Sequence, residues 1–304
     1  MKKLLALTLI IMLVVSLAAC TKPKAVDEQT ALLDQDENWY IPEKIIIGAI
    51  PTQNQGDMKN AMDKLGEHFS KELGTQVIVE VYPDYNGVVE AMNYGQVDMA
   101  YFGPLTYIIA NDRGGAEAIM TLLVNGEPFY YSYMIAHVDS PINTLEDMIT
   151  DVGQYQFAFG DVNSTSGSLI PTLALKEKGV FRDQMDTDFK EIFYTGGHDA
   201  AALAVQEKKV DVGAVDSAIF EVMKKNGVVD ETKLKVIWQS EPLFQYPWAV
   251  KKGTPNELKE AFQEAFLKVT DQEILDVFGA NGFIKADDKD YEPVRQAAKA
   301  DGRL

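Results

Sequence analysis

The chain of 304 residues has one cysteine, three histidines and few basic side chains relative to acidic ones. A lone cysteine cannot form an internal disulfide, so no covalent cross-link is expected in the fold. The 28 lysine and arginine residues stand against 46 aspartate and glutamate residues, which gives a formal net charge of −18. Binding to nucleic acid or to anionic lipid depends on basic side chains. The composition therefore predicts no nucleic-acid partner and no adsorption to anionic membranes.

The first residues have the pattern of an export signal. Two lysines precede the apolar run of residues 4–17, and two alanines separate this run from Cys20. A charged start, a short apolar core and a small-residue end are typical of a secretory signal. The run is shorter than the roughly 20 residues of a membrane-spanning helix. We therefore expect residues 1–19 to be a signal peptide that is absent from the fold.

Cys20 directly follows Leu17-Ala18-Ala19, and this arrangement resembles the bacterial lipobox. The resemblance implies cleavage before Cys20 and a diacylglycerol on its sulfur, whereas the alternative is an ordinary signal peptide with an incidental cysteine. Residues 20–42 have too few apolar side chains to pack, which predicts a flexible tether behind the acylated cysteine. The lipid would be the only attachment to the membrane, at the outer face of the cytoplasmic membrane or in the periplasm.

From residue 43 onward, strand and helix patterns alternate in two successive blocks. The strand patterns lie at residues 45–50, 76–82, 97–102, 119–124 and 130–137, and then at 155–160, 189–194, 210–215, 234–238 and 246–250. Such alternation implies α/β lobes with parallel sheets covered on both faces by helices. The last patterns, at 256–270, 272–278 and 291–299, are helical and are expected to pack on the first lobe without forming another sheet.

The predicted fold is bilobed, with two chain crossings near residues 132–140 and 241–250. Lobe 1 takes residues 43–135 and 247–304, and lobe 2 takes residues 136–246. In α/β folds, ligands bind at strand ends and helix starts, so a small ligand is expected in the cleft between the lobes.

A cluster of hydroxyl side chains follows the strand pattern that ends at Gly160. Ser164, Thr165 and Ser166 precede Gly167, and a helix pattern begins there. The first turn of a helix has free N–H groups and a partial positive charge, and three hydroxyl donors beside it suit a tetrahedral oxyanion. Local donors of this kind can hold an anion in an acidic protein. The alternative is a helix N-cap with spare hydroxyls.

Further donors lie at other strand ends. His198 begins a helix pattern after Thr195-Gly196-Gly197 and can donate a hydrogen bond to an oxyanion. Tyr85 lies in a strand-to-helix turn, and Tyr130 and Tyr246 lie near the two crossings. The alternatives are a surface histidine and half-buried packing tyrosines.

Asp216 ends the strand pattern of residues 210–215. A carboxylate repels a dianion, so its place in an oxyanion site would be to accept a hydrogen bond from a protonated P–OH group or to pair with a ligand amine. An unmatched charge of this kind can reject a fully ionised look-alike. The alternative is an N-cap for the helix pattern that begins at Ser217.

Together these residues resemble the periplasmic phosphonate- and phosphite-binding proteins of ABC importers, the PhnD-like group. The resemblance covers roughly residues 45–250. The matching segments are Gly48-Ala49-Ile50-Pro51, Pro83-Asp84-Tyr85, residues 95–104, residues 139–142, residues 163–169, residues 197–201 and residues 210–216.

The resemblance implies a type II periplasmic-binding-protein fold, no enzymatic activity and no cofactor. It implies that Ser164, Thr165, Ser166 and His198 hold the phosphorus oxygens, and that Tyr85 and Tyr130 contribute from the first lobe and the hinge. Tyr101, within residues 95–104, is an additional candidate. The implied partners are a small phosphorus oxyanion and a transmembrane permease, and the binding protein itself is expected to be a monomer.

The resemblance also bears on the ligand. Binders of 2-aminoethylphosphonate in this group place carboxylates against the ligand amine, at positions that correspond here to Ala218 and Tyr246. Neither side chain can pair with an ammonium group. Asp216 together with Tyr246 is similar to the phosphite and small-phosphonate binders, which favours phosphite or methylphosphonate.

Three other functions remain as alternatives. A secreted phosphoester or ester hydrolase could use Ser164, His198 and Asp216, although no Gly-x-Ser-x-Gly elbow is present. A metal-uptake protein would need several converging ligands, and the three histidines are far apart in sequence. A binder of a different small solute could have the same fold.

Overall fold

The computed structural model describes residues 41–304, and everything below refers to this part of the chain. The expected signal peptide, the acylation of Cys20 and nearly all of the tether lie outside the described residues and stay predictions. Within residues 41–304, none of the helices combines the length and the apolar character that a membrane span requires.

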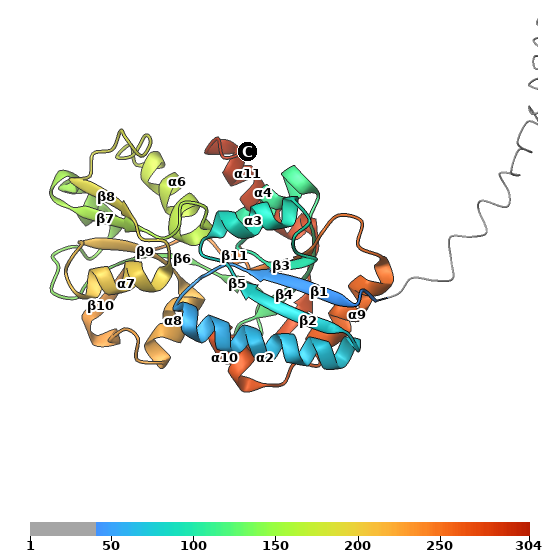
Figure 1. The fold of residues 1–304 in the computed structure, drawn as a ribbon. Coiled ribbons are helices and arrows are strands. Elements are labelled where there is room, and N and C mark those ends of the chain that lie inside the picture. Colours follow the sequence, from blue (N-terminus) through green and yellow to red (C-terminus); the bar gives the residue numbers. More distant parts are fainter. Residues whose placement is uncertain (1–40) are drawn as a thin grey trace, which may run out of the picture. The chain divides into compact units, whose positions relative to one another are not determined.

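The first of two large sheets has six strands in the order β13-β4-β12-β3-β1-β2 (Figure 1). β1 runs parallel to β2 and β3, whereas β12 and β13 run antiparallel to their neighbours. The strands are β1 (Lys44–Ala49), β2 (Gln76–Val81), β3 (Met99–Tyr101), β4 (Glu117–Leu123), β12 (Pro247–Val250) and β13 (Gly282–Lys285).

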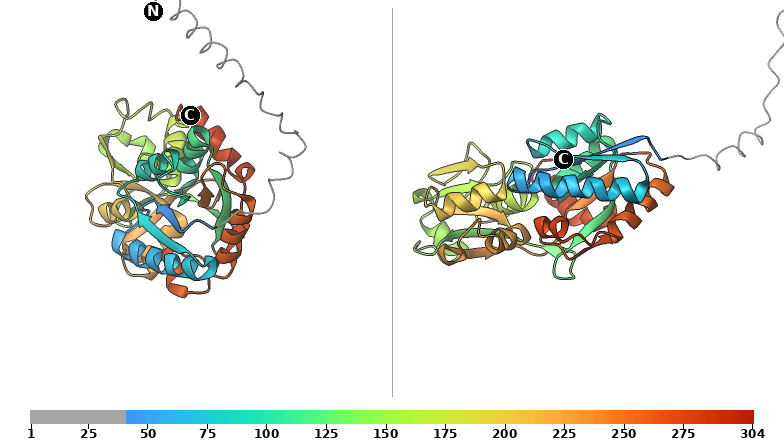
Figure 2. Two further views of the ribbon diagram at one scale, coloured as in Figure 1. Left: turned by 45° about the vertical axis from the view of Figure 1, so that its right-hand side comes forward. Right: turned by 60° about the horizontal axis from the view of Figure 1, so that its bottom comes forward.

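The second sheet has five strands in the order β10-β6-β9-β7-β8. β7 runs parallel to β8 and β9, whereas β6 and β10 are antiparallel. The strands are β6 (Ser132–His137), β7 (Gln156–Phe159), β8 (Glu191–Tyr194), β9 (Val212–Asp216) and β10 (Leu234–Gln239). Figure 2 shows the two sheets in separate lobes of residues 41–304.

Helices cover both faces of each sheet. On the first sheet, α2, α9 and α10 pack together on one face, and α3, α4 and α11 pack on the other (Figure 1). On the second sheet, α7 and α8 lie on one face and α6 on the other. The helices are α2 (Gln55–Leu73), α3 (Tyr85–Asn93), α4 (Pro104–Gly114), α5 (Leu145–Thr150), α6 (Ile170–Glu177), α7 (His198–Gln206), α8 (Ser217–Lys225), α9 (Asn256–Leu267), α10 (Gln272–Phe278) and α11 (Glu292–Ala300). Short helical turns lie at η1 (Val152–Gln154), η2 (Thr165–Leu169), η3 (Glu231–Lys233) and η4 (Asp288–Tyr291).

A two-stranded ribbon connects the lobes. β5 (Phe129–Tyr130) follows β4, β11 (Leu243–Phe244) precedes β12, and the two pair antiparallel. The first crossing therefore lies between β4 and β6. Because β6 belongs entirely to the second sheet, this crossing comes earlier than residues 132–140, and the lobe boundary expected at residue 135 would divide a continuous strand.

The two-lobed α/β fold is confirmed, but two details of the sequence-based expectation are wrong. Both sheets are mixed rather than parallel. β6 enters the second sheet from the first crossing, β12 re-enters the first sheet from the second crossing, and each runs antiparallel to its neighbours. In addition, the C-terminal region is not wholly helical, since β13 pairs with β4 at the edge of the first sheet. Its four residues are too few to give a strand pattern of their own.

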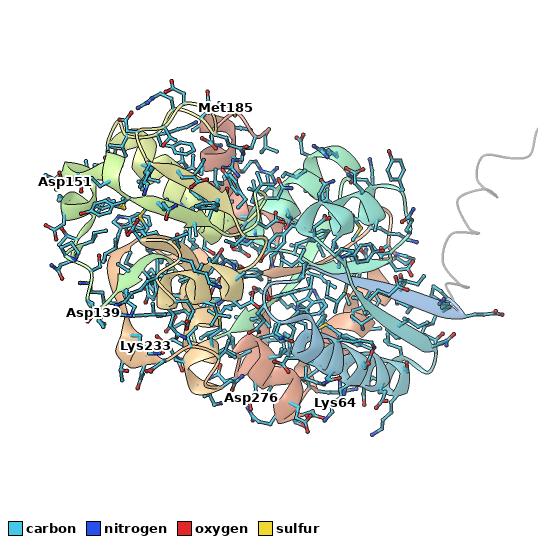
Figure 3. The ribbon with its side chains drawn as sticks, turned by 60° about the vertical axis from the view of Figure 1, so that its left-hand side comes forward. Lys64, Asp139, Asp151, Met185, Lys233 and Asp276 are labelled. Carbon is cyan, nitrogen blue, oxygen red and sulfur yellow. The ribbon has the colours of Figure 1, made fainter. Side chains whose placement is uncertain are left out.

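Most of the interior is apolar and most charged side chains lie outside, although Asp216 is fully buried. Lys64, Asp139 and Asp276 are among the charged side chains at the surface (Figure 3). Lys64 pairs with Glu273 at 2.6 Å, and Asp276 pairs with Lys225 at 3.0 Å. Exposed pairs of this kind each contribute only ~0–1 kcal/mol, so burial of the apolar core carries most of the stability.

Candidate oxyanion-binding site

Parallel strands bring the predicted site residues to one place. In the second lobe, β7, β8 and β9 run parallel, so the segments that follow them meet at one edge of the sheet. These segments carry Ser164, His198 and Asp216. In the first lobe, β1 and β2 end in the same way just before Thr52 and Tyr85. The two edges face each other across the cleft.

Ser164 caps a π-helical turn, η2, which continues into α6. Its Oγ accepts the backbone N–H of Gly167 at 3.0 Å. Ser164 Oγ is therefore a helix N-cap, as the alternative interpretation expected. The hydroxyl hydrogen is not used by this bond, so Ser164 can still donate to a ligand.

Gly167 allows the helix start to approach its neighbours closely. A Cβ atom at this position would lie 2.9 Å from Ser164 Oγ and 3.1 Å from both Gly160 Cα and His198 Cε1. Side-chain carbon atoms do not pack this tightly, so any other residue would push His198 away from the hydroxyl cluster.

Thr165 and Ser166 differ in how their hydroxyls are used. Thr165 Oγ1 accepts the N–H of Leu105 at 2.8 Å, which joins the second lobe to the start of α4 in the first. The carbonyl of Ser166 accepts a bond from Ser132 Oγ at 2.6 Å. The Oγ of Ser166 is fully buried and has no hydrogen-bond partner among the described residues.

His198 is a neutral donor in this structure. The backbone N–H of Asp216 donates to its Nδ1 at 3.3 Å, so the ring proton belongs on Nε2, which lies 3.3 Å from the hydroxyl of Tyr246. Burial lowers the pKa of His198 to about 3. The expected donor role therefore rests on the neutral imidazole.

Three tyrosines close the site from the first lobe and the crossings. Tyr85 begins α3, Tyr130 lies in β5, and Tyr246 follows β11, with its ring 5.3 Å from that of Tyr130. The buried hydroxyls of Tyr85 and Tyr130 have no partner within residues 41–304. Burial, together with nearby carboxylates, raises the pKa of each of these tyrosines well above its ordinary value. All three therefore remain protonated donors.

Asp216 uses one of its two carboxyl oxygens. Oδ1 accepts the N–H of Ile219 at 2.9 Å and caps α8, as the structural alternative expected. Oδ2 is buried and has no partner in the described part of the chain. Burial raises the pKa of Asp216 to about 7, although the hydrogen bond from the Ile219 N–H acts in the opposite direction.

A small cavity adjoins Asp216. Its volume is about 10 Å³, and its walls include Tyr101, Ala218, Gln245 and Tyr246. The ring of Tyr101 stacks on that of Tyr246 at 5.5 Å, which places this additional candidate beside the site.

The structure also adds residues that sequence reasoning missed. Thr52 lines the small cavity, and its carbonyl accepts the N–H of His198 at 3.3 Å. Gln245 lines the same cavity. Thr52 follows the segment Gly48-Ala49-Ile50-Pro51, and Gln245 immediately precedes the candidate Tyr246. In the sequence, only this closeness to segments already singled out indicated that the two residues could belong to the site.

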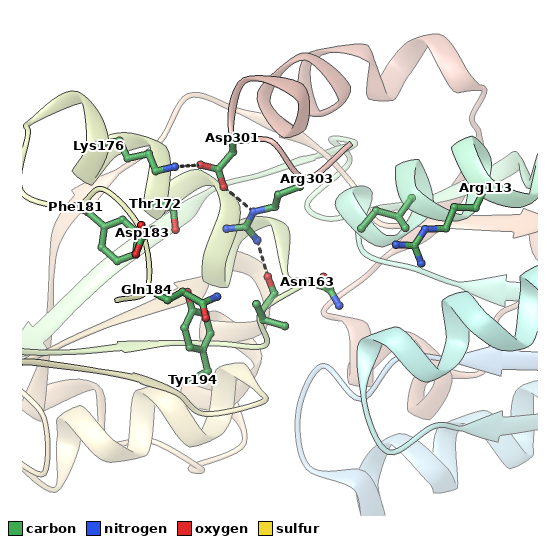
Figure 4. A pocket seen from close by; sticks show the side chains of 12 residues that line it. Arg113, Asn163, Thr172, Lys176, Phe181, Asp183, Gln184, Tyr194, Asp301 and Arg303 are labelled. Carbon is green, nitrogen blue, oxygen red and sulfur yellow. Dashed lines mark hydrogen bonds and ion pairs between the residues drawn. The ribbon is translucent and has the colours of Figure 1, made fainter. Parts of the chain in front are cut away.

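A far larger cavity, of about 500 Å³, lies near the C-terminus (Figure 4). Three of its charged side chains form ion pairs with one another. Asp301 pairs with Lys176 at 2.6 Å and with Arg303 at 2.7 Å. Arg303 also donates to the carbonyl of Val162 at 2.6 Å and to Ser168 Oγ at 3.1 Å. None of the predicted site residues lines this cavity.

The geometry does not form a catalytic triad. In a triad, the carboxylate accepts a bond from His Nδ1–H, and His Nε2 faces the serine. Here Nδ1 of His198 accepts a backbone N–H, Nε2 faces Tyr246, and Ser164 Oγ is bonded to Gly167. Within residues 41–304, no group of three or more metal-binding side chains is placed to hold an ion. What converges here is a set of buried donors around one carboxyl group.

Residues 47–291 match the family model described as ABC transporter, phosphonate, periplasmic substrate-binding protein. The chain belongs to this family. Its members are binding components of transporters and not enzymes, and the resemblance to the PhnD-like group is thereby confirmed.

Individual relatives agree with this family. The phosphate-import protein PhnD of Mycolicibacterium smegmatis is 30% identical over 282 residues, which cover 86% of this chain and 87% of that protein. The phosphonates-binding periplasmic protein of Escherichia coli is 30% identical over 83% of this chain and 75% of its own length. A binding-protein component of an ABC phosphonate transporter from Pseudomonas aeruginosa superposes with a TM-score of 0.78 at 29% identity, covering 86% of this chain and 87% of that one.

Proposed function

We propose that this phosphonate-family binding protein takes a phosphorus oxyanion with small substituents, phosphite or methylphosphonate, in preference to 2-aminoethylphosphonate. One observation carries the proposal. Four buried polar atoms without partners among the described residues converge at the cleft: the hydroxyls of Tyr85, Tyr130 and Ser166, and Oδ2 of Asp216. Leaving a buried polar group unpaired costs ~1–3 kcal/mol, so such a cluster favours a polar ligand between the lobes.

The donors match the oxygens of a tetrahedral anion. Ser164, Thr165 and Ser166 supply hydroxyl hydrogens from the start of η2, and His198 supplies Nε2–H. Tyr85 and Tyr130 complete the set from the opposite side. Neutral donors can hold an anion strongly in a water-excluded site, because bonds to a charged acceptor are stronger than those between neutral groups.

Asp216 makes the site selective for ligands that carry a proton. With Oδ2 facing an anion, one proton must lie between that oxygen and the ligand, since two like charges at hydrogen-bond distance repel each other. The raised pKa of Asp216, about 7, makes this sharing available near neutral pH. When Asp216 is ionised, a fully ionised anion such as sulfate brings no proton and is disfavoured.

The small cavity limits what can stand beside Asp216. About 10 Å³ is roughly the space that one water molecule needs. A single hydroxyl group is of this size, so the space beside Asp216 takes one P–OH group. Ala218 and Tyr246 also offer no carboxylate to an ammonium group.

Ligand binding is coupled to closure of the lobes. Two bonds join them beside the site: the N–H of Leu105 to Thr165 Oγ1, and the N–H of His198 to the carbonyl of Thr52. Because the site side chains are buried, the lobes must separate before a ligand can enter. The proposal includes anchoring through Cys20 outside the cytoplasm and delivery from the closed form to a transmembrane permease.

The test is a calorimetric titration of the chain from residue 21 with phosphite, methylphosphonate, 2-aminoethylphosphonate, phosphate and sulfate. Phosphate is included because the mycobacterial relative is named for phosphate import. We expect tight binding of phosphite or methylphosphonate and none of sulfate. A preference for 2-aminoethylphosphonate would overturn the ligand assignment, and no binding of any phosphorus ligand would overturn the proposed function.

A further inference from the structure

Gln245 is a buried polar residue that connects the two crossings. It lies between β11 and β12 and is 2% exposed. Its backbone N–H donates to the carbonyl of Pro128 at 2.9 Å, and its carbonyl accepts the hydroxyl of Tyr291 at 3.0 Å. These two bonds fix its backbone beside the small cavity.

The orientation of the Gln245 side chain follows from its own contact. Oε1 accepts the N–H of Tyr246 at 3.1 Å, and the reversed amide would place two donors against each other. Nε2 must therefore point away from that N–H. It is buried and has no partner within residues 41–304, and Gln245 lines the small cavity.

The small cavity thus has one unpaired donor and one unpaired acceptor. The donor is Nε2 of Gln245 and the acceptor is Oδ2 of Asp216. Most of the remaining wall is apolar and comes from Leu122, Ala218, Ile219, Val277 and Phe278. A hydroxyl group both donates and accepts a hydrogen bond, and it fits a space the size of one water molecule.

We propose that Gln245 is a specificity-determining residue that donates Nε2–H to the oxygen of a ligand P–OH group, while the P–OH proton is directed to Oδ2 of Asp216. This inference rests on the proposed function and adds to it which group on phosphorus faces the cavity. A P–H or P–CH₃ group in the same place leaves both Gln245 and Asp216 unpaired, and buried unpaired groups disfavour such a complex.

Phosphite and hypophosphite test this directly near pH 7, where Asp216 is partly ionised. Affinity is counted per monoanion, because the phosphite monoanion has one P–OH group and hypophosphite has none. Hypophosphite is also smaller, so exclusion by size cannot explain weaker binding. We expect the wild-type protein to bind phosphite at least about tenfold more tightly than hypophosphite, which is the effect of one hydrogen bond in a buried site.

Two variants remove the donor with side chains of different shape. Gln245→Met and Gln245→Leu each remove both polar atoms of the amide. Each should lower the ratio of phosphite to hypophosphite affinity by about tenfold, mainly through phosphite. Gln263→Met is the matched control, because Gln263 donates to the carbonyl of Ile119 in the first lobe, and its ratio should equal that of the wild type.

The outcomes separate this inference from the proposed function. An unchanged ratio of phosphite to hypophosphite affinity in the Gln245 variants would overturn the inference alone. If both affinities fall equally, Gln245 has a purely structural role. Thermal unfolding without ligand shows whether each variant is folded. If the wild-type protein binds no phosphorus anion, both the inference and the proposed function fail.

Discussion

Two polar regions between the lobes of this protein differ in how their groups are satisfied. At the C-terminal junction, Lys176, Asp301 and Arg303 bind each other, and Arg303 reaches across to Ser168. At the cleft, Asp216 is the only carboxylate among the proposed ligand contacts, and several buried polar atoms have no partner in the described chain. The junction has the larger cavity and more charge, yet the cleft is the candidate binding site.

The difference teaches that unsatisfied buried groups locate a binding site better than charge or cavity size. Groups that are already paired gain little from a ligand, because binding would only exchange one partner for another. Groups that closure leaves unpaired make the empty closed form costly, so a ligand that pairs them stabilises closure. The C-terminal pairs stabilise the contact between the lobes with or without a ligand.

The largest expected effect concerns Asp216 and pH. Its pKa is about 7 in the folded protein and near 3.8 in the unfolded chain, so its contribution to stability is present below pH 4 and is lost as pH rises to 7. Asp216→Asn removes this loss and keeps an N-cap. The free energy of unfolding of the variant minus that of the wild type should rise by up to about 4 kcal/mol between pH 4 and 7.

Chemical denaturation at several pH values checks this without ligand. His198, whose pKa of about 3 is below its unfolded value of 6.5, makes stability rise with pH below 6.5, but both proteins share this contribution and it cancels in the difference. Asp230→Asn is the control. Asp230 is an exposed cap whose pKa is lowered by its bonds to Thr232. The free energy of unfolding of Asp230→Asn minus that of the wild type should therefore fall as pH rises. If the difference in free energy of unfolding between Asp216→Asn and the wild type does not change with pH, Asp216 does not have a raised pKa in the folded protein.

The next largest effect compares two serines of one helical turn. Ser166 and Ser168 are both fully buried, but Ser166 Oγ has no partner among residues 41–304, whereas Ser168 Oγ accepts a bond from Arg303. Ser166→Ala should weaken phosphite binding by about ten- to a hundredfold, the effect of losing one bond to a charged group, with no loss of stability. Ser168→Ala should lower stability by about 1 kcal/mol with little change in affinity.

Calorimetry and denaturation on the same two variants settle the serine comparison. If the two alanine variants show the same pattern, then unpaired and paired serines of this turn do not have different roles, and the distinction between the two regions fails.

The smallest expected effect concerns the C-terminal junction itself. Arg303→Met removes the bonds to Val162 and Ser168, which connect the lobes in this closed structure. Affinity should fall about fivefold, and equally for phosphite and methylphosphonate, because closure is affected and ligand contacts are not. Arg182→Met is the control, since its bonds to Asp186 and Asp188 lie within the second lobe. A change in ligand preference for Arg303→Met would contradict this assignment.

The sequence predicted those parts of the site that depend on local chain geometry. The hydroxyl cluster at residues 164–166, His198 and Asp216 each follow a strand directly, and parallel strands bring such segments to one edge. Gln245 could not be found in this way, because it lies between β11 and β12, where its place depends on the crossings between the lobes. The mixed sheets were missed for a similar reason, since the direction of β6 and β12 is set by the crossings and not by their own patterns.

The central claim is that the unpaired groups of the cleft are the ligand contacts. A crystal structure of the complex with phosphite tests it most directly. The account predicts the anion between the lobes, within hydrogen-bond distance of Ser166 Oγ, the hydroxyls of Tyr85 and Tyr130, and Oδ2 of Asp216. An anion held instead at the C-terminal junction, beside Lys176 and Arg303, would contradict the account.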